Sequence, residues 1–242
     1  MQQNRQTELL IKELEEKYGE ERTSMLVEYM DMILEKNQYI NLTAVRDRDE
    51  ALQKHIADSL SCDFMEEYEA AENVIDIGTG AGFPGVPLAI VSPDKKFTLV
   101  DSLNKRLRII DELTGELGIK NVTTVHGRAE DVGKSKEHRE QYDICVSRAV
   151  ESLDVLCEWC LPLVKKGGYF VAYKGENVSR ETEDAANAIK LLGGKIAEIR
   201  KVQTEEESIS GHVLVMIKKV KNTPSKYPRQ AGQAKKNPLR LR

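Results

Sequence analysis

Hydrophobic residues recur every three or four positions in the N-terminal part of the chain, up to about residue 70. This spacing places them on one face of an α-helix. It predicts helices at residues 5–18 and 21–36, a break at 37–43, and a third helix from Asp47 or Asp49 to about Met65. We expect residues 1–70 to form a helical cap on the rest of the chain, not an independent domain.

From about residue 71 short β-rich runs alternate with amphipathic stretches. The predicted strands are 73–77, 97–101, 122–126, 142–147, 168–173, 194–201 and 212–220, and the predicted helices are 84–91, 104–117, 152–164 and 179–191. Such alternation predicts βαβ units and a mainly parallel sheet. The last two strands leave no room for a crossover helix, so they should pair antiparallel. The expected fold class of residues 71–221 is therefore α/β, a Rossmann-like sheet of seven strands with an antiparallel C-terminal strand.

Composition narrows the class of protein. Of the 242 residues, 40% are hydrophobic and 31% are charged, and no apolar run approaches the roughly 20 residues of a membrane span. The N-terminus has no apolar signal-peptide core, so we expect a cytoplasmic protein. The four cysteines are too scattered for a disulfide framework, and the lone Cys157-x-x-Cys160 lies in an apolar helical stretch. We therefore expect no metal site.

Charge is distributed unevenly. Nine Lys or Arg and no Asp or Glu lie between residues 218 and 242, although the whole chain carries a formal charge of −4. Residues 222–242 contain three prolines and predict an extended basic tail. A basic tail on an acidic body indicates a polyanionic partner, with a merely solubilising tail as the alternative. The cations available for phosphate contacts are Lys226, Arg229, Lys235, Lys236 and Arg240.

A glycine-rich turn follows the first predicted strand. Residues 76–85 read DIGTGAGFPG, and Asp101 ends the second strand about twenty residues later. Glycines allow the tight turn and the close approach of a ligand, and Asp101 can accept ribose hydroxyls. The turn also satisfies the dinucleotide pattern, which leaves NAD open. Asp76 favours S-adenosylmethionine, because a carboxylate there suits a cationic cofactor better than a pyrophosphate. The candidate cofactor residues in this part are Asp76, Gly78, Gly80, Gly82, Phe83 and Asp101.

Two further strand ends fit an adenosine pocket. Ala129 and Glu130 follow the third strand, where polar groups could contact an adenine ring. Arg148 follows the fourth strand, at the sheet edge where open α/β sheets bind ligands. A surface ion pair is the alternative for Arg148.

Eight short motifs occur in order along nearly the whole chain and resemble the RsmG family, also called GidB. They are residues 41–46 (NLTAVR), 55–60 (HIADSL), 76–85 (DIGTGAGFPG), 100–102 (VDS), 127–130 (GRAE), 147–150 (SRAV), 173–175 (YKG) and 227–229 (YPR). This bacterial family methylates N7 of a guanosine in 16S ribosomal RNA. The resemblance implies a class I methyltransferase fold, S-adenosylmethionine as cofactor, and 16S ribosomal RNA or the small ribosomal subunit as partner. It also implies that the cofactor is contacted by Gly78, Phe83, Ala129, Glu130 and Arg148. Residues 232–239 depart from the family's pattern, which leaves the RNA contacts of the tail open.

Guanine N7 carries a free lone pair, so the implied reaction needs alignment and no general base. Arg148 and Lys174, at the ends of the fourth and fifth strands, are the candidates for positioning the substrate. His55 and Asp58 lie three apart on one helix face, either near the cleft as a lid contact or as a structural hydrogen bond. The tail hypothesis predicts that truncation after Val220 weakens RNA binding and leaves cofactor binding intact.

Three other functions compete with this one. An NAD-dependent oxidoreductase would use the same turn, but no hydride-transfer residue is evident. A non-enzymatic RNA-binding module would have no use for the intact turn and Asp101. A methyltransferase acting on another RNA fits the same residues. Nothing in the sequence indicates an obligate interface, so we expect a monomer.

Overall fold

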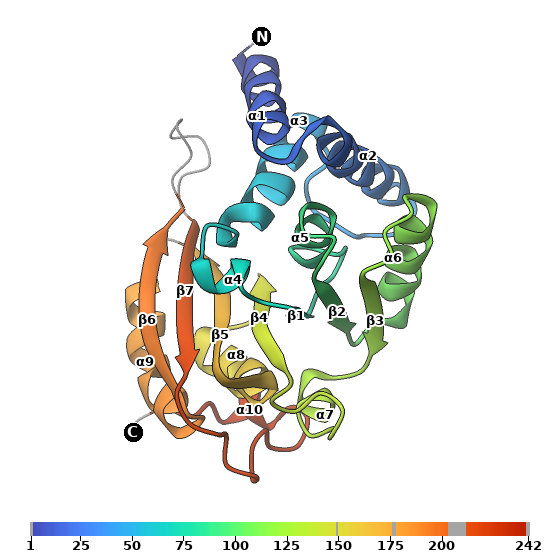
Figure 1. The fold of residues 1–242 in the computed structure, drawn as a ribbon. Helices are drawn as coiled ribbons and strands as arrows, with labels where there is room; N and C mark the ends of the chain where they lie inside the picture. Colours follow the sequence, from blue (N-terminus) through green and yellow to red (C-terminus); the bar gives the residue numbers. More distant parts are fainter. Residues whose placement is uncertain (1, 149, 176–177, 203–211, 241–242) are drawn as a thin grey trace.

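The computed structural model describes residues 2–148, 150–175, 178–202 and 212–240, with the side chains of residues 2–4 left aside. Within these residues seven strands form one sheet in the order β3-β2-β1-β4-β5-β7-β6 (Figure 1). The strands are β1 Asn73–Ile77, β2 Lys96–Asp101, β3 Val122–His126, β4 Tyr142–Arg148, β5 Val164–Gly175, β6 Gly194–Lys201 and β7 His212–Lys219. Neighbouring strands pair parallel from β3 through β2, β1 and β4 to β5. The strand β7 runs antiparallel to both β5 and β6. The predicted Rossmann-like α/β sheet with an antiparallel C-terminal strand is confirmed.

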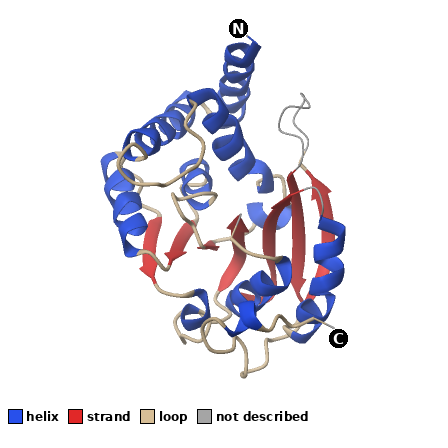
Figure 2. Cartoon of the chain, turned by 180° about the vertical axis from the view of Figure 1, so that it is seen from behind, coloured by secondary structure: helices blue, strands red, loops and turns tan. Residues whose placement is uncertain are grey.

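Each face of the sheet contributes to its own hydrophobic core, because successive side chains of a strand point to opposite sides. Val74 joins the core that contains α5 Gly85–Val91 and α6 Asn104–Glu116. Its neighbour Ile75 joins the core that contains α8 Leu153–Cys160 and α9 Val178–Leu191. The view from behind shows the helices on both sides of the strands (Figure 2). The sheet is thus the middle layer of three.

The N-terminal helices close one end of the first core. They are α1 Gln2–Tyr18, α2 Glu20–Lys36, α3 Arg48–Ala51, the π-helical turn η1 Leu52–Ala57, the 3₁₀ turn η2 Leu60–Cys62 and α4 Glu66–Glu69. Buried Leu26, Tyr29 and Ile56 belong to the same core as Val74 of β1. The cap therefore shares its core with the sheet. The third helix was predicted as continuous to Met65 and instead contains a π turn and ends at Cys62.

The helix predicted at 152–164 ends earlier. Cys160 is the last residue of α8, a 3₁₀ turn η3 covers Leu161–Leu163, and β5 begins at Val164. Pro162 lies in that turn and has no N–H to continue an α-helix. The predicted strand began at residue 168 instead of Val164, because residues 165–168 carry no apolar side chain that would indicate a strand.

The C-terminal segment, residues 220–240, packs on the second core. It was predicted to be extended, yet it contains α10 Gln233–Lys236, and Tyr227 and Ala234 are buried in that core. Figure 1 shows it in red beneath α8, beside α7 Ala129–Val132. Most of this basic segment is therefore part of the folded body.

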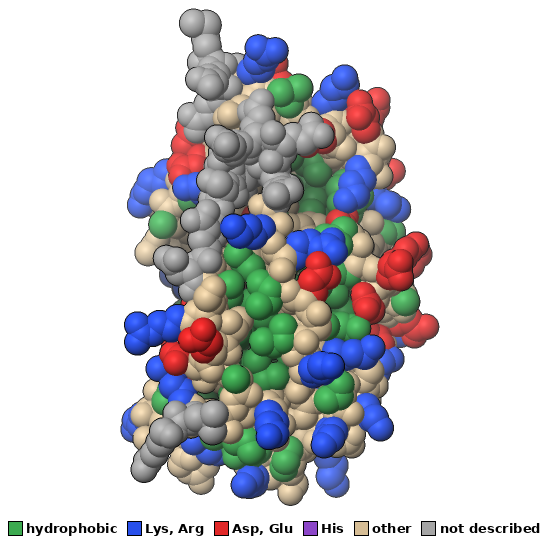
Figure 3. Space-filling model, turned by 90° about the vertical axis from the view of Figure 1, so that its left-hand side faces the viewer, with side chains coloured by type: hydrophobic (Ala, Val, Ile, Leu, Met, Phe, Trp, Pro, Cys, Tyr) green, Lys and Arg blue, Asp and Glu red, His purple; other side chains and the backbone are tan. Residues whose placement is uncertain are grey.

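The strand β6 forms one edge of the sheet. Its side chains are mostly exposed and include Lys195, Glu198 and Arg200, and charged side chains of this kind discourage pairing with another chain. On this side hydrophobic side chains lie among scattered lysines and arginines (Figure 3). Among the described helices, none is long and apolar enough to cross a bilayer.

Candidate functional site

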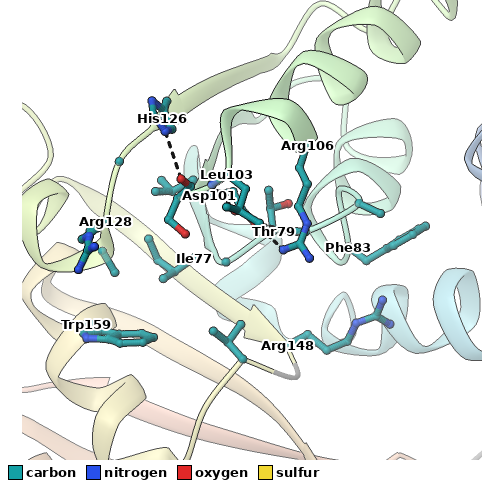
Figure 4. Close-up of a pocket in the computed structure, with 18 of the residues that line it drawn as sticks. Ile77, Thr79, Phe83, Asp101, Leu103, Arg106, His126, Arg128, Arg148 and Trp159 are labelled. Carbon is teal, nitrogen blue, oxygen red and sulfur yellow. Dashed lines mark hydrogen bonds and ion pairs between the residues drawn. The ribbon is translucent and has the colours of Figure 1, made fainter. Parts of the chain in front are cut away.

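A cavity of about 990 Å³ opens at the carboxyl ends of β1, β2, β3 and β4. This is the edge at which open α/β sheets bind ligands, and the volume lies at the upper end of the usual range for ligand pockets. Three other parts of the chain complete its walls. The cap supplies Leu42, Thr43 and His55, α8 supplies Trp159, and the C-terminal segment supplies Gly232 and Lys235. Figure 4 shows Phe83 and Arg148 on one side of Ile77, and Arg128 and Trp159 on the other.

The glycine-rich turn forms the floor of this cavity. Gly78 and Gly80 line it, and both have positive φ values, +73° and +61°. A Cβ on Gly78 would lie 2.6 Å from Cγ2 of Val150, so only glycine leaves this part of the cavity open. Gly82, with φ +86°, is not among the lining residues and faces Tyr29 of the cap. Gly82 therefore packs against the cap in this structure, and its contact with a ligand stays a prediction.

Asp76 lies beneath the turn and is completely buried. Its Oδ2 accepts hydrogen bonds from Thr79 Oγ1 at 2.7 Å and from the Gly85 amide at 2.9 Å. Its Oδ1 is buried with no hydrogen-bond partner. Burial raises the pKa of Asp76 to about 6, although the bonds from Thr79 and Gly85 oppose the shift. Asp76 is not a lining residue of the cavity; it ties the two ends of the turn together.

Asp101 lines the cavity at the end of β2 and is 5% exposed. Its two oxygens accept bonds from the backbone amides of Gly80 at 3.0 Å and Leu103 at 2.8 Å, and Arg106 lies 3.5 Å from Oδ2. These bonds fix the carboxylate against the turn. Each carboxylate oxygen has a second lone pair, so Asp101 can accept further hydrogen bonds from a ligand.

The one-turn helix α7 carries the next two predicted residues. Ala129 and Glu130 both line the cavity, and Glu130 is 4% exposed. Its Oε1 accepts a hydrogen bond of 2.9 Å from the backbone amide of Gly232 in the C-terminal segment. Arg128, just before α7, is exposed and also lines the cavity.

Phe83, His55 and Arg148 form a stack at the cap end of the cavity. The rings of His55 and Phe83 are parallel within 17°, with centroids 4.9 Å apart, and the Arg148 guanidinium lies 5.3 Å from the Phe83 centroid. Arg148 donates to Asp58 Oδ2 at 2.8 Å and to the Lys54 carbonyl at 3.1 Å. The π turn and the residue after it thus hold the arginine that ends β4. Of the two alternatives predicted for His55 and Asp58, the structure shows the structural one, because both residues contact Arg148 at the end of β4. His55 also lines the cavity and Asp58 does not, and a lid contact stays a prediction.

The Arg148 guanidinium lowers the pKa values of both His55 and Asp58. Burial lowers the pKa of His55 to about 4, and the neighbouring Arg148 adds to the shift. Arg148 Nη2 lies 3.3 Å from His55 Nδ1 and can only donate, so Nε2 carries the proton toward Thr43 Oγ1 at 2.7 Å. Burial acts to raise the pKa of Asp58, but the His212 hydrogen bond and Arg148 hold it below its usual value.

The remaining predicted cations lie in different surroundings. Lys174 is not among the lining residues; it donates to the Glu151 carbonyl at 2.8 Å and pairs with Glu181 at 2.7 Å. Arg229 forms a bidentate ion pair with buried Glu158. Lys235 lines the cavity and pairs with Glu151. Lys226 and Lys236 are exposed.

Several lining residues were not predicted from the sequence. The main ones are Arg106, His126, Arg128, Val150 and Trp159. Arg128 and Val150 lie inside the motifs at 127–130 and 147–150, and Arg106 follows Asp101 by five positions, so the sequence held a signal for these three residues. Trp159 carried no such signal, because its place in an apolar helix predicted only core packing. Ala149, part of the motif at 147–150, lies outside the described residues.

Comparison with known proteins identifies the family. Residues 22–210 match the family described as rRNA small subunit methyltransferase G. The chain belongs to that family. Proteins named ribosomal RNA small subunit methyltransferase G are similar over nearly the full length. The one from Clostridium tetani is 45% identical over 92% of this chain and 93% of its own, and that from Alkaliphilus oremlandii is 49% identical over 90% of each.

Solved structures resemble the fold at much lower sequence identity. The antibiotic-resistance methyltransferase Kmr matches with a TM-score of 0.51 and 18% identity, over 63% of this chain and 88% of that one. A 16S rRNA (adenine(1408)-N(1))-methyltransferase from Catenulisporales acidiphilia, solved with its cosubstrate, matches with a TM-score of 0.51 and 14% identity, over 69% and 92%. These two likenesses support the fold and nothing finer.

Proposed function

We propose that this protein transfers a methyl group from S-adenosylmethionine to N7 of a guanosine in 16S ribosomal RNA. The observation that carries the proposal is the cavity, in which the glycine turn and Asp101 meet Ala129 and Glu130 in a chain of the methyltransferase G family. We further propose that it acts as a monomer in the cytoplasm, on ribosomal RNA or the small ribosomal subunit.

Four groups of residues suit the cofactor. The carboxylate of Asp101 is held by two backbone amides and has lone pairs left for the ribose hydroxyls. Ala129 and Glu130 line the cavity, and we propose that they contact the adenine ring. Positive φ at Gly78 and Gly80 keeps side chains out of the space between these groups and Arg148. Arg148 suits the cofactor carboxylate, because a guanidinium can bind it with two hydrogen bonds.

The bound cofactor supplies an electrophilic methyl group on a sulfonium. The protein's contribution is to hold the guanine close to that group and in line with it. His55 has both ring nitrogens engaged and a pKa of about 4, so it is not placed to accept a proton. Attack by N7 requires no such acceptor, because this nitrogen carries a free lone pair.

Cations around the cavity suit an RNA strand. Arg106, Arg128 and Lys235 line it, and Lys226 and Lys236 are exposed on the C-terminal segment. Such groups neutralise phosphates without selecting a sequence, and the target base has to leave its stack to enter a cavity of this kind.

The test is transfer of a radiolabelled methyl group to 16S ribosomal RNA and to small ribosomal subunits, followed by mapping of the modified base. We expect label at a guanine, as a product that aniline cleaves after reduction. Titration with NAD serves as a control for the competing oxidoreductase. Binding of NAD without binding of S-adenosylmethionine would refute the proposal.

The variant Asp101→Ala probes the ribose contact. We expect its dissociation constant for S-adenosylmethionine to rise at least about tenfold, which corresponds to roughly 1.4 kcal/mol. The matched control is Asp94→Ala, which removes an exposed carboxylate that precedes the amino end of β2. Equal affinities for the two variants would contradict the role given to Asp101.

A further inference from the structure

The C-terminal segment reaches the cofactor cavity, although its charge and prolines predicted an extended tail. Gly232 and Lys235 are lining residues of the cavity, and Lys235 lies over the ring of Trp159 with its Nζ 5.4 Å from the centroid. The segment therefore forms one wall of the site.

The segment also holds α7, the short helix that carries Ala129 and Glu130. At the start of α7 the Gly232 amide donates to Glu130 Oε1 at 2.9 Å. At its end Gly133 faces Pro228, and a Cβ added to Gly133 would lie 3.1 Å from Cγ of Pro228. A helix of a single turn has little stability of its own, so contacts of this kind determine its position.

Arg139 connects the two parts through backbone carbonyls. Its guanidinium donates to the Gly133 carbonyl at 3.1 Å and to the Tyr227 carbonyl at 2.8 Å. A further bond of 2.8 Å reaches the Thr223 carbonyl. Arg139 is not a lining residue of the cavity, so it can act on a ligand only through α7 and the segment.

Ion pairs and buried polar groups fix the segment to the rest of the fold. Arg229 pairs with Glu158, and Arg240 reaches Asp154 and Asp184. Lys219 is completely buried at the end of β7 and donates to Thr223 Oγ1 at 2.8 Å. The segment is thus anchored before, within and after the part that touches α7.

We infer that the C-terminal segment positions α7 and thereby sets the affinity for the adenosyl part of the cofactor, with Arg139 and Pro228 as positioning residues. This inference rests on the proposed use of S-adenosylmethionine. It also reverses the expectation from the sequence that removal of the segment leaves cofactor binding intact.

The test compares cofactor binding by three full-length variants, measured by isothermal titration with S-adenosylmethionine and S-adenosylhomocysteine. Arg139→Ala removes the link between α7 and the segment, and Pro228→Ala removes the contact with Gly133. Gln230→Ala is the matched control, because its side chain is exposed on the same segment and does not line the cavity. We expect at least about tenfold weaker binding for Arg139→Ala, a smaller loss for Pro228→Ala, and no change for Gln230→Ala.

Two readouts separate positioning from a general loss of structure. The KM for the cofactor should rise while kcat at saturating cofactor stays within about twofold. Hydrogen exchange of the amides in residues 129–133 should quicken in Arg139→Ala, and strands β1 and β4 should keep their protection. Wild-type affinity in folded Arg139→Ala would overturn the inference, as would wild-type affinity in Pro228→Ala if Arg139→Ala does not fold. Failure of the wild-type protein to bind either ligand would instead refute the proposed function and the inference with it.

Discussion

Replacement of Gly82 by alanine should damage the contact between the glycine turn and the helical cap. Gly82 has φ +86°, and its added Cβ would lie 2.7 Å from Val86 Cγ2 and 3.3 Å from Tyr29 Cζ, with the Tyr29 hydroxyl closer still. The left-handed backbone costs about 1–2 kcal/mol for an L-residue, and overpacking costs about 1–3 kcal/mol more. We expect Gly82→Ala to lower the free energy of unfolding by about 2–5 kcal/mol.

A second substitution, at Tyr29, tests whether the clash with its hydroxyl causes part of this loss of stability. Tyr29→Phe removes the hydroxyl that donates to the Ala81 carbonyl at 2.8 Å, and this alone should cost about 1–2 kcal/mol. In the double variant the hydroxyl no longer opposes the added Cβ. The combined loss should therefore be smaller than the sum of the two single losses, by about 1 kcal/mol.

Urea unfolding of the four proteins, followed by far-UV circular dichroism, measures this coupling. Single losses that add within about 0.5 kcal/mol would show that the Tyr29 hydroxyl and the position of Gly82 are independent. That result would refute the steric coupling inferred between the glycine turn and the cap.

Three further predictions concern the cluster at the cap end and Lys174. The pKa of His55 is about 4 in the folded chain, so the unfolded chain takes up this proton first, and stability should fall as pH drops from about 6.5 toward 4. Urea unfolding measures the free energy of unfolding at pH 7 and at pH 5. Between these two values the wild type should lose about 2 kcal/mol more than His55→Gln, and equal losses would contradict a neutral buried ring. Asp58→Asn should weaken cofactor binding several-fold, because Arg148 loses its ion pair with Asp58, whereas the control Asp49→Asn on the same cap should not. Fluorescence titration measures both affinities, and equal values would contradict a role of Asp58 in holding Arg148. Lys174→Ala should lower the unfolding free energy by roughly 1 kcal/mol and leave cofactor affinity within about twofold, because its partners Glu181 and Glu151 lie outside the group of lining residues.

The strands of the sheet were predicted well from the sequence, because the pattern that indicates each strand is local. Each strand is a short apolar run bounded by turn residues, and the lack of a crossover between 201 and 212 predicted the antiparallel pairing of β6 and β7. The glycine turn and Asp101 were also predicted together, since the strand ends that carry them are adjacent in any sheet of this kind.

What the sequence did not predict depends on contacts between distant segments. Glu130 and Gly232 are 102 positions apart, and no local pattern pairs them. The sequence predicted phosphate contacts for Arg229 and Lys235, but it did not predict that each forms an ion pair with an acidic residue of the same chain. The π turn at Leu52–Ala57 was hidden because it keeps nearly the same hydrophobic spacing as an α-helix.

The reversed direction of β7 has a consequence for the path that the chain takes after the sheet. Because β7 starts opposite Gly175 and ends opposite Tyr169, the chain leaves the sheet at the edge remote from the cavity. The C-terminal segment must then return beneath α8 before Gly232 and Lys235 can line the cavity. A chain truncated after β7 would therefore keep all seven strands and lack one wall of its binding site, and we expect it to compete poorly with the full-length protein for the methyl donor.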